Sequence, residues 1–105
     1  MFARNVSIHL KLNSSEAFTH HIENETIPML RKQAGFQGEI TFLAPGGTEA
    51  VAISLWDNKE NADAWGRTGY PDVLKSLNKF VEGAKVQTYE VVNSTFHKIA
   101  ATKAA

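Results

Sequence analysis

Apolar and polar residues alternate strictly along the segment 4–12. The apolar members of this segment are Val6, Ile8, Leu10 and Leu12. A period of two residues with β-branched members is typical of a β-strand, so this segment is the first predicted strand. Similar runs predict strands at 36–43, 49–56 and 84–92, and residues 95–99 either extend the last strand or add to it.

Helical signals fill the interval between the first two strands. Ser14 is the predicted N-cap of a helix that ends at Gly35, because serine favours the start of a helix and glycine its end. Pro28 lacks a backbone N–H and clashes with the carbonyl group of Asn24 in a regular helix. The sequence therefore predicts a kink or a restart of the helix near Ile27.

A second helical region follows the third strand. The residues 57–58 can cap its start, and Gly66 and Gly69 are expected to interrupt it. Pro71 suits the first turn of a further helical segment, which is predicted to continue with helical spacing of apolar residues until Gly83.

The resulting order is βαββαβ, with the turn at 45–47 joining the second and third strands into a hairpin. This order predicts a single ferredoxin-like α+β domain over residues 1–105, in which a four-stranded antiparallel sheet carries both helical regions on one face. One face of the sheet is expected to carry Val6, Ile8 and Leu10, and the opposite face Leu43, Ala52 and Trp56. Either of these two faces can be the one that packs under the helices. A second copy of the chain is the simplest cover for two apolar faces, so a homodimer is expected.

Composition narrows the range of partners. The chain has no cysteine, which excludes disulfides, thiolate nucleophiles and cysteine metal sites. Eleven basic and eleven acidic residues give a formal charge of zero, so no field attracts nucleic acid. The start of the chain lacks the pattern of a secretory signal, and no stretch approaches the roughly 20 apolar residues of a membrane span. We therefore expect a cytoplasmic protein with a small-molecule or protein partner and no contact with membranes.

Three stretches carry a family resemblance that covers nearly the whole chain. They are residues 33–38, with Gly-Phe directly after the first helix, residues 51–57, where a strand ends at Trp56, and residues 61–65, which end at Trp65. Together they resemble the antibiotic biosynthesis monooxygenase-like group of dimeric α+β barrel proteins. The resemblance implies a homodimer whose sheets face each other, with a pocket between sheet and helices in each subunit. The group includes cofactor-free oxygenases of aromatic polyketides or quinols, haem-degrading enzymes, isomerases and proteins of no known activity.

Asn5 and Trp65 match positions that line the pocket in the oxygenase and haem-degrading branches, and the resemblance implies catalytic roles for both. An amide can hold a carbonyl or peroxide-like oxygen, and an indole offers a flat wall to an aromatic ligand. The alternative is that Asn5 is a solvated strand residue and Trp65 a core anchor. A shared site requires both side chains to face the space between sheet and helices. Opposite placement would favour a binding module.

Three further residues are candidates. His9 can act as a general base from the polar face of the first strand, or it has a structural or interfacial role. Tyr70 can cover the mouth of a pocket and contact substrate, or it is an ordinary loop residue. Asn78 stands where the haem-degrading branch carries an axial histidine; an amide ligates iron poorly, so Asn78 is a substrate-binding candidate and no haem is expected. The four histidines form no metal-ligand pattern, and neither a metal nor another cofactor is expected.

Three functions remain open. The first is a cofactor-independent monooxygenase that acts on an electron-rich phenol or quinol, which itself activates oxygen. The second is a non-catalytic dimeric module that binds a ligand or a protein. The third is an isomerase on the same scaffold, with His9 moving protons. A closed aromatic-lined cavity of roughly a few hundred cubic ångströms would favour an enzyme, whereas a core filled by Phe18, Phe36 and Phe80 would favour the module.

Overall fold

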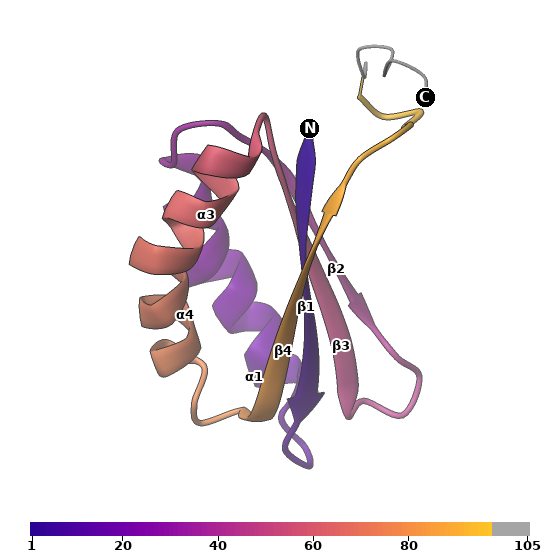
Figure 1. Ribbon diagram of the computed structural model, residues 1–105. Coiled ribbons are helices and arrows are strands. Elements are labelled where there is room, and N and C mark those ends of the chain that lie inside the picture. Colours follow the sequence, from indigo (N-terminus) through magenta and orange to yellow (C-terminus); the bar gives the residue numbers. More distant parts are fainter. Residues whose placement is uncertain (98–105) are drawn as a thin grey trace.

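The computed structural model describes residues 1–97 and contains one antiparallel sheet of four strands, with the helices packed on one of its faces (Figure 1). The strands lie in the order β2-β3-β1-β4. In chain order the elements are β1 (Phe2–Leu10), α1 (Ser15–His21), the π-helical turn η1 (Ile22–Thr26), α2 (Ile27–Arg31), β2 (Phe36–Leu43), β3 (Glu49–Trp56), α3 (Lys59–Thr68), α4 (Tyr70–Ser76) and β4 (Val81–Glu90). This arrangement confirms the predicted ferredoxin-like α+β fold.

The first helical region is broken where Pro28 predicts a break. Pro28 lies in the first turn of α2, directly after η1. The N–H group of Ile27 donates to the carbonyl of Ile22, five residues earlier, which is the wider spacing of a π-helix. Ser14 occupies the predicted N-cap position, although its hydroxyl donates to the carbonyl of Leu12 instead of capping the helix.

Two boundaries in the second half of the chain differ from the prediction. Gly66 lies inside α3, and the second helical region is interrupted only at Gly69, between α3 and α4. The strand β4 begins at Val81, three residues before the predicted start, because Val81 pairs with Leu10 of β1 and the carbonyl of Phe80 accepts from the N–H group of Lys11. Pairing with β1 therefore decides the conformation of residues whose apolar spacing also suits a helix. Of the predicted extension at 95–99, residues 95–97 form no strand and the remainder lies outside the described residues.

The pairing register decides which residues face the helices. Val6 lies opposite Ala52 of β3 and Val86 of β4, and directly paired residues share one face of a sheet. Val6 and Ala52 line the space under the helices. The expectation that Ala52 and Trp56 lie on the face away from Val6 is wrong, because the sequence shows the alternation within each strand but not the register between strands.

An aromatic cluster attaches α3 to the sheet. Trp56 is fully buried at the end of β3 and packs edge-on against Phe36, with 5.6 Å between the ring centroids. Trp65 of α3 stacks on Trp56 at 6.0 Å. Gly35, in the turn before β2, has a φ of +79°, and a Cβ there would lie 2.2 Å from a carboxyl oxygen of Asp57. This close approach explains the glycine of the Gly-Phe pair.

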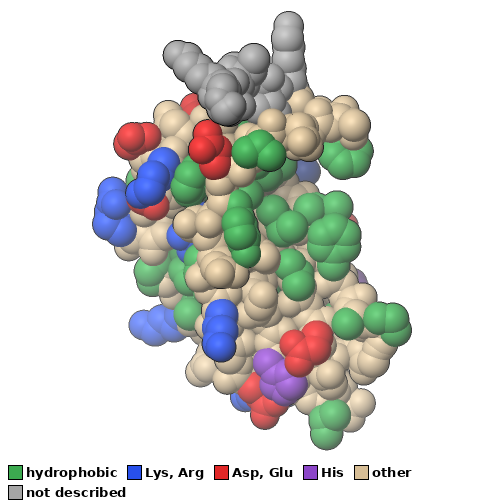
Figure 2. Space-filling view, turned by 45° about the vertical axis from the view of Figure 1, so that its right-hand side comes forward, with side chains coloured by type: hydrophobic (Ala, Val, Ile, Leu, Met, Phe, Trp, Pro, Cys, Tyr) green, Lys and Arg blue, Asp and Glu red, His purple; other side chains and the backbone are tan. Residues whose placement is uncertain are grey.

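The second face of the sheet carries exposed hydrophobic side chains. Ile40, Phe42 and Tyr89 are each about half exposed there, and Figure 2 shows hydrophobic side chains gathered over this surface. Among residues 1–97, no helix or strand covers it (Figure 1), and the segment after β4 touches it at the start of β2, where His97 Nε2 lies 3.2 Å from the carbonyl of Gln37. Within that same range, no helix has the length and apolar character needed to cross a membrane.

Candidate functional site

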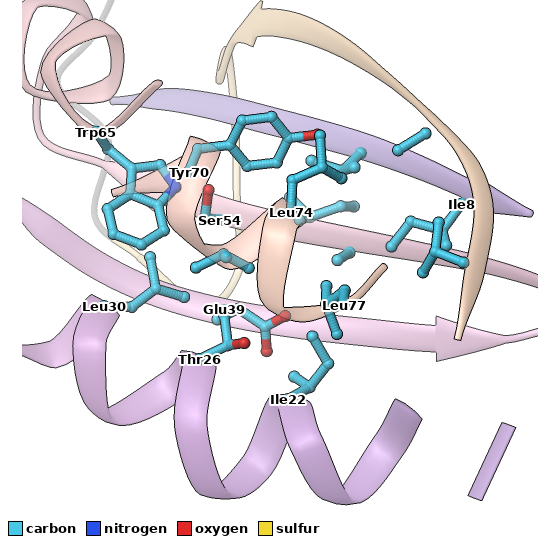
Figure 3. A pocket seen from close by; sticks show the side chains of 16 residues that line it. Ile8, Ile22, Thr26, Leu30, Glu39, Ser54, Trp65, Tyr70, Leu74 and Leu77 are labelled. Atoms are coloured by element: carbon cyan, nitrogen blue, oxygen red, sulfur yellow. The ribbon is translucent and has the colours of Figure 1, made fainter. Parts of the chain in front are cut away.

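A cavity of about 50 Å³ lies between the helix-facing surface of the sheet and the helices η1, α2, α3 and α4. Most of its wall consists of isoleucine, leucine, valine and alanine side chains. The exceptions are the indole of Trp65 and four residues with polar groups, Thr26, Glu39, Ser54 and Tyr70 (Figure 3). A mostly apolar pocket with a few converging polar groups is the usual form of a small-molecule site.

A row of polar residues crosses the sheet beneath the helices. Ser54 of β3 pairs with Glu39 of β2 on one side and with Arg4 of β1 on the other, and Arg4 pairs in turn with Thr88 of β4. Because directly paired residues project to the same face, all four side chains start from the helix-facing surface. The sheet therefore presents an acidic group and a guanidinium group on either side of a serine.

Glu39 carries the carboxyl group of this row. It is half-buried, and its Oε2 accepts a hydrogen bond of 2.5 Å from the hydroxyl of Thr41. Burial raises the pKa of Glu39 above its ordinary value, and the hydrogen bond from Thr41 opposes part of that rise. A carboxyl whose pKa moves toward neutrality is better suited to exchange protons with a ligand.

Thr26 supplies a buried hydroxyl without a partner. Its side chain is 7% exposed, and within residues 1–97 its Oγ1 makes no hydrogen bond. Thr19 and Thr68, which lie in regular helices, each donate to the carbonyl four residues earlier at 2.8 Å. Thr26 lies in the π-helical turn, where the spacing of the carbonyls differs. Its hydroxyl is therefore available to a molecule in the cavity.

Arg4 is buried beside Tyr70. The guanidinium carbon lies 4.8 Å from the centroid of the Tyr70 ring, and the side chain is 7% exposed. Burial lowers the pKa of Arg4, while the charges of Tyr70 and Asp63 oppose that effect. Burial also raises the pKa of Tyr70, with an opposing effect from Arg4. Within the described chain, Arg4 forms no salt bridge and its Nε has no hydrogen-bond partner.

The aromatic wall of the cavity is held rigidly. Trp65 is 4% exposed and stacks on Trp56, whose indole N–H donates to Ser54 Oγ at 2.9 Å. Gly69 also packs against the indole, so closely that a Cβ would lie 2.1 Å from Trp65 Cζ3. The orientation of the Trp65 ring is therefore fixed before any ligand enters.

The structure separates Asn5 from Trp65. Asn5 pairs with Ile53 and Gln87 and projects to the face away from the helices, because Val6 next to it lines the cavity. Trp65 lines the cavity on the helical side. The expectation that both face one cavity is wrong, and the physical reason is the two-residue period of β1.

His9 and Asn78 also lie outside the cavity. His9 is exposed on the same face as Asn5, with Nδ1 2.6 Å from Glu49 and Nε2 3.1 Å from Glu82. These carboxylates raise the pKa of His9, the bond to Glu49 most of all. Asn78 is exposed and lines a separate surface pocket beside Glu82. Of the residues predicted from the sequence, the cavity brings together Trp65 and Tyr70.

The sequence reasoning missed Glu39, Thr26 and the row that contains Arg4. Glu39 and Thr41 alternate with Ile40 and Phe42, which suggests that the polar side of this strand faces water. The register shows the reverse, because Glu39 pairs with Ser54 on the helix-facing surface. The signal that the sequence offered was a charged side chain within each of two predicted strands, Glu39 in one and Arg4 in the other. Within residues 1–97, no group of His, Asp and Glu side chains has the geometry of a metal site.

Comparison with known proteins shows where this fold has been seen. No protein-family model and no curated protein matches the sequence. A protein provisionally described as an antibiotic biosynthesis monooxygenase from Nitrosomonas europaea has a TM-score of 0.73 at 16% identity, over 89% of this chain and 100% of that one. SnoaB, a cofactor-independent oxygenase from Streptomyces nogalater, has a TM-score of 0.70 at 11% identity, over 90% of this chain and 95% of that one. The protein NE2512 of unknown function, also from Nitrosomonas europaea, has a TM-score of 0.74 at 12% identity, over 96% of this chain and 95% of that one.

The chain therefore has the fold of the antibiotic biosynthesis monooxygenase proteins, as the resemblance in its sequence implies. Identities of 11% to 16% establish a shared fold. Proteins of one fold catalyse unrelated reactions, so the function has to be argued from the cavity itself.

Proposed function

We propose that this protein binds a flat aromatic molecule in the cavity between sheet and helices, and oxidises it with molecular oxygen without a bound cofactor. The observation that carries the proposal is the combination of an apolar cavity, the fixed indole of Trp65 and the phenol ring of Tyr70. Aromatic walls bind flat rings by stacking and by apolar contact. The fold of SnoaB, which is described as a cofactor-independent oxygenase, supports the reaction class.

The reaction class is the conversion of a phenol to a quinone. One atom of O₂ replaces the hydrogen on a ring carbon and becomes the second carbonyl, the other atom leaves as water, and the substrate supplies all four electrons. An electron-rich phenolate can reduce O₂ itself, so the protein has to orient the ring, keep bulk water away and manage protons. The apolar cavity wall is suited to the first two tasks.

A ligand larger than one ring requires more room than the cavity offers. Its volume of about 50 Å³ is small beside the roughly 300–1,000 Å³ of sites for drug-sized molecules. A second hollow of about 530 Å³ lies between the helices and β2, and Ile22 and Glu39 line both spaces. Leu74, which also lines the cavity, is 36% exposed, so this part of the wall borders solvent. The ligand would therefore place one ring in the cavity and extend past Glu39 into the wider hollow.

The proposal includes a homodimer formed through the face of the sheet that carries Ile40, Phe42 and Tyr89. Uncovered apolar side chains on a sheet favour association. A second copy of the chain would supply the apolar cover that these half-exposed side chains lack.

The test is oxygen labelling. The protein is incubated under ¹⁸O₂ with a panel of electron-rich phenols and quinols, and products are examined by mass spectrometry. We expect one labelled oxygen in the product of at least one phenol, and a reduced rate for Trp65→Phe. An absence of labelled product across the whole panel would refute the proposed oxidation, whether or not a member of the panel binds.

A binding module without chemistry is the second candidate, and two observations favour it. Asn5 and Trp65 lie on opposite faces of the sheet, and the cavity is smaller than a typical substrate site. This candidate predicts saturable binding of an aromatic ligand with no ¹⁸O in any product. The isomerase alternative depends on His9, which lies outside the cavity between two carboxylates.

A further inference from the structure

We propose that Glu39 is the proton acceptor of the cavity, that Thr26 supplies a second hydrogen bond, and that the ligand is therefore an aromatic ring with a free hydroxyl group. This inference rests on the proposed function and names the residues that would recognise the hydroxyl group of its phenol substrate. It assigns a catalytic role to Glu39 and a role in substrate specificity to Thr26.

The first support is the position of the carboxyl group. Among the residues that line the cavity, all of them within the described part of the chain, Glu39 is the one with an acidic side chain. The hydroxyl of Thr41 holds Oε2, while Oε1 has no hydrogen bond within residues 1–97. Glu39 also lines the wider hollow, so it lies where a ligand would pass from one space to the other. Thr41 acts as a positioning residue that fixes the carboxyl group.

The second support is the unpartnered hydroxyl of Thr26. A buried hydroxyl without a hydrogen bond is costly, and such groups in native proteins commonly meet a ligand or a water molecule. Figure 3 shows the Thr26 hydroxyl and the Glu39 carboxyl on one side of the cavity, across from Trp65 and Tyr70. A ring stacked against the aromatic wall would thus direct an edge substituent toward both groups.

The charged groups around Glu39 leave it without a counter-ion. Glu23 of η1 and Arg31 of α2 line the wider hollow, Tyr70 of α4 faces the cavity, and Arg4 lies two strands away in the polar row. None of these groups forms a salt bridge with Glu39 in the described chain. A neutral hydroxyl enters an apolar cavity at a lower desolvation cost than an ammonium group, which is why we infer a hydroxyl donor.

The proton transfer can be written completely. The O–H bond of the ring hydroxyl breaks, its electron pair stays on oxygen as a phenolate, and the proton bonds to Oε1 of the Glu39 carboxylate. The phenolate is the species that reduces O₂ in the proposed oxidation. Glu39 then returns this proton to the oxygen atom that leaves as water, and the hydrogen lost from the ring carbon as a proton supplies the second proton of that water, so the carboxylate is regenerated in each cycle.

Phenol and toluene test this inference, because a methyl group replaces the hydroxyl at nearly equal size. Binding of each probe to the protein is followed by NMR at a series of pH values that spans the ionisation of Glu39. Free phenol stays protonated throughout this range. We expect phenol to bind about tenfold more tightly than toluene when Glu39 is ionised, the scale of one hydrogen bond to a charged group. The preference should fade as the carboxyl becomes protonated.

Two variants separate the roles. In Glu39→Gln the preference for phenol should no longer change with pH, and in Thr26→Val the affinity for phenol should fall while that for toluene stays. Equal binding of the two probes by the wild type at every pH would overturn the inference and leave the aromatic cavity intact. Failure of both probes to bind would remove the proposed function and this inference with it.

Discussion

The guanidinium group of Arg4 lies over the ring of Tyr70, 4.8 Å from its centroid, and joins β1 to the first turn of α4. Both side chains are more than half buried. The Tyr70 ring is the partner that the structure gives to this cation, because Arg4 forms no salt bridge within residues 1–97. Two opposing effects follow: the ring attracts the cation, and burial penalises its charge.

These effects predict that Arg4→Met changes the free energy of unfolding by no more than about 1 kcal/mol. Loss of the cation–π contact destabilises the variant, and removal of a desolvated charge stabilises it, each by amounts of this order. Urea unfolding measures the change in the free energy of unfolding. A double-mutant cycle with Arg4→Met, Tyr70→Leu and the double variant isolates the interaction energy between the two side chains. A loss of about 3 kcal/mol or more in Arg4→Met would show that the arginine has a stronger partner.

Two glycines three residues apart should respond differently to alanine. At Gly69 a Cβ would lie 2.1 Å from Cζ3 of the buried Trp65 ring, which cannot move, so Gly69→Ala should destabilise the protein by about 1–3 kcal/mol or more. At Gly66 the nearest atom is Nη1 of Arg4 at 2.4 Å, the end of a flexible side chain. Alanine there also gains about 1 kcal/mol of helix propensity.

Gly66→Ala is therefore the matched control, and we expect it to remain within about 1 kcal/mol of wild type. Thermal and urea unfolding of both variants provide the comparison. Equal destabilisation by the two substitutions would contradict a rigid Trp65 beside Gly69.

The free energy of unfolding should depend on pH because of the Glu39 carboxyl group. Burial raises the pKa of Glu39 above 4.5, so between 4.5 and the raised value the folded state holds more protons than the unfolded state. The free energy of unfolding therefore falls as pH rises through this window. Glu39→Gln does not titrate, and its stability relative to wild type should increase with pH across the window and then level off. Urea unfolding at a series of pH values checks this, and a relative stability that falls with pH would contradict the burial of the carboxyl.

The exposed sheet face should hold two copies together. Phe42 is 51% exposed on the open face of the edge strand β2, so Phe42→Lys places a charge where the second copy would pack. We expect light scattering to give twice the chain mass for the wild type and a shift to monomer for Phe42→Lys. Leu12→Lys is the control, because Leu12 is 81% exposed outside the sheet. A wild type that is monomeric at micromolar concentration would refute the dimer.

Local sequence signals predicted the elements that depend on local chemistry. The bounds of β2 and β3 agree with the strands predicted at 36–43 and 49–56, and the break before Pro28 and the cap at Asn58 are present. The N–H group of Asn61 donates to Asn58 Oδ1 at 2.9 Å. Each of these features is decided by a proline, a turn or a capping side chain.

The register between strands could not be predicted in the same way, and it decides the site. It places Asn5 away from Trp65 and turns Glu39 toward the helices. An alternating strand shows which residues share a face, but a shift of one residue exchanges the faces. Tertiary pairing also extends β4 back to Val81, against the helical spacing of its apolar residues.

The most direct test of the ligand site is an NMR titration of ¹⁵N-labelled wild-type protein with phenol. The account predicts that chemical shifts change at Thr26, Glu39 and Ser54 and at the indole N–H of Trp65, all of which line the cavity under the helices. The amides of the β2–β3 turn, residues 45–47, line neither the cavity nor the wider hollow and serve as a reference for weak surface binding. Changes confined to the side chains of Asn5 and Gln87, on the open face of the sheet, would contradict the account and place the ligand in the dimer interface.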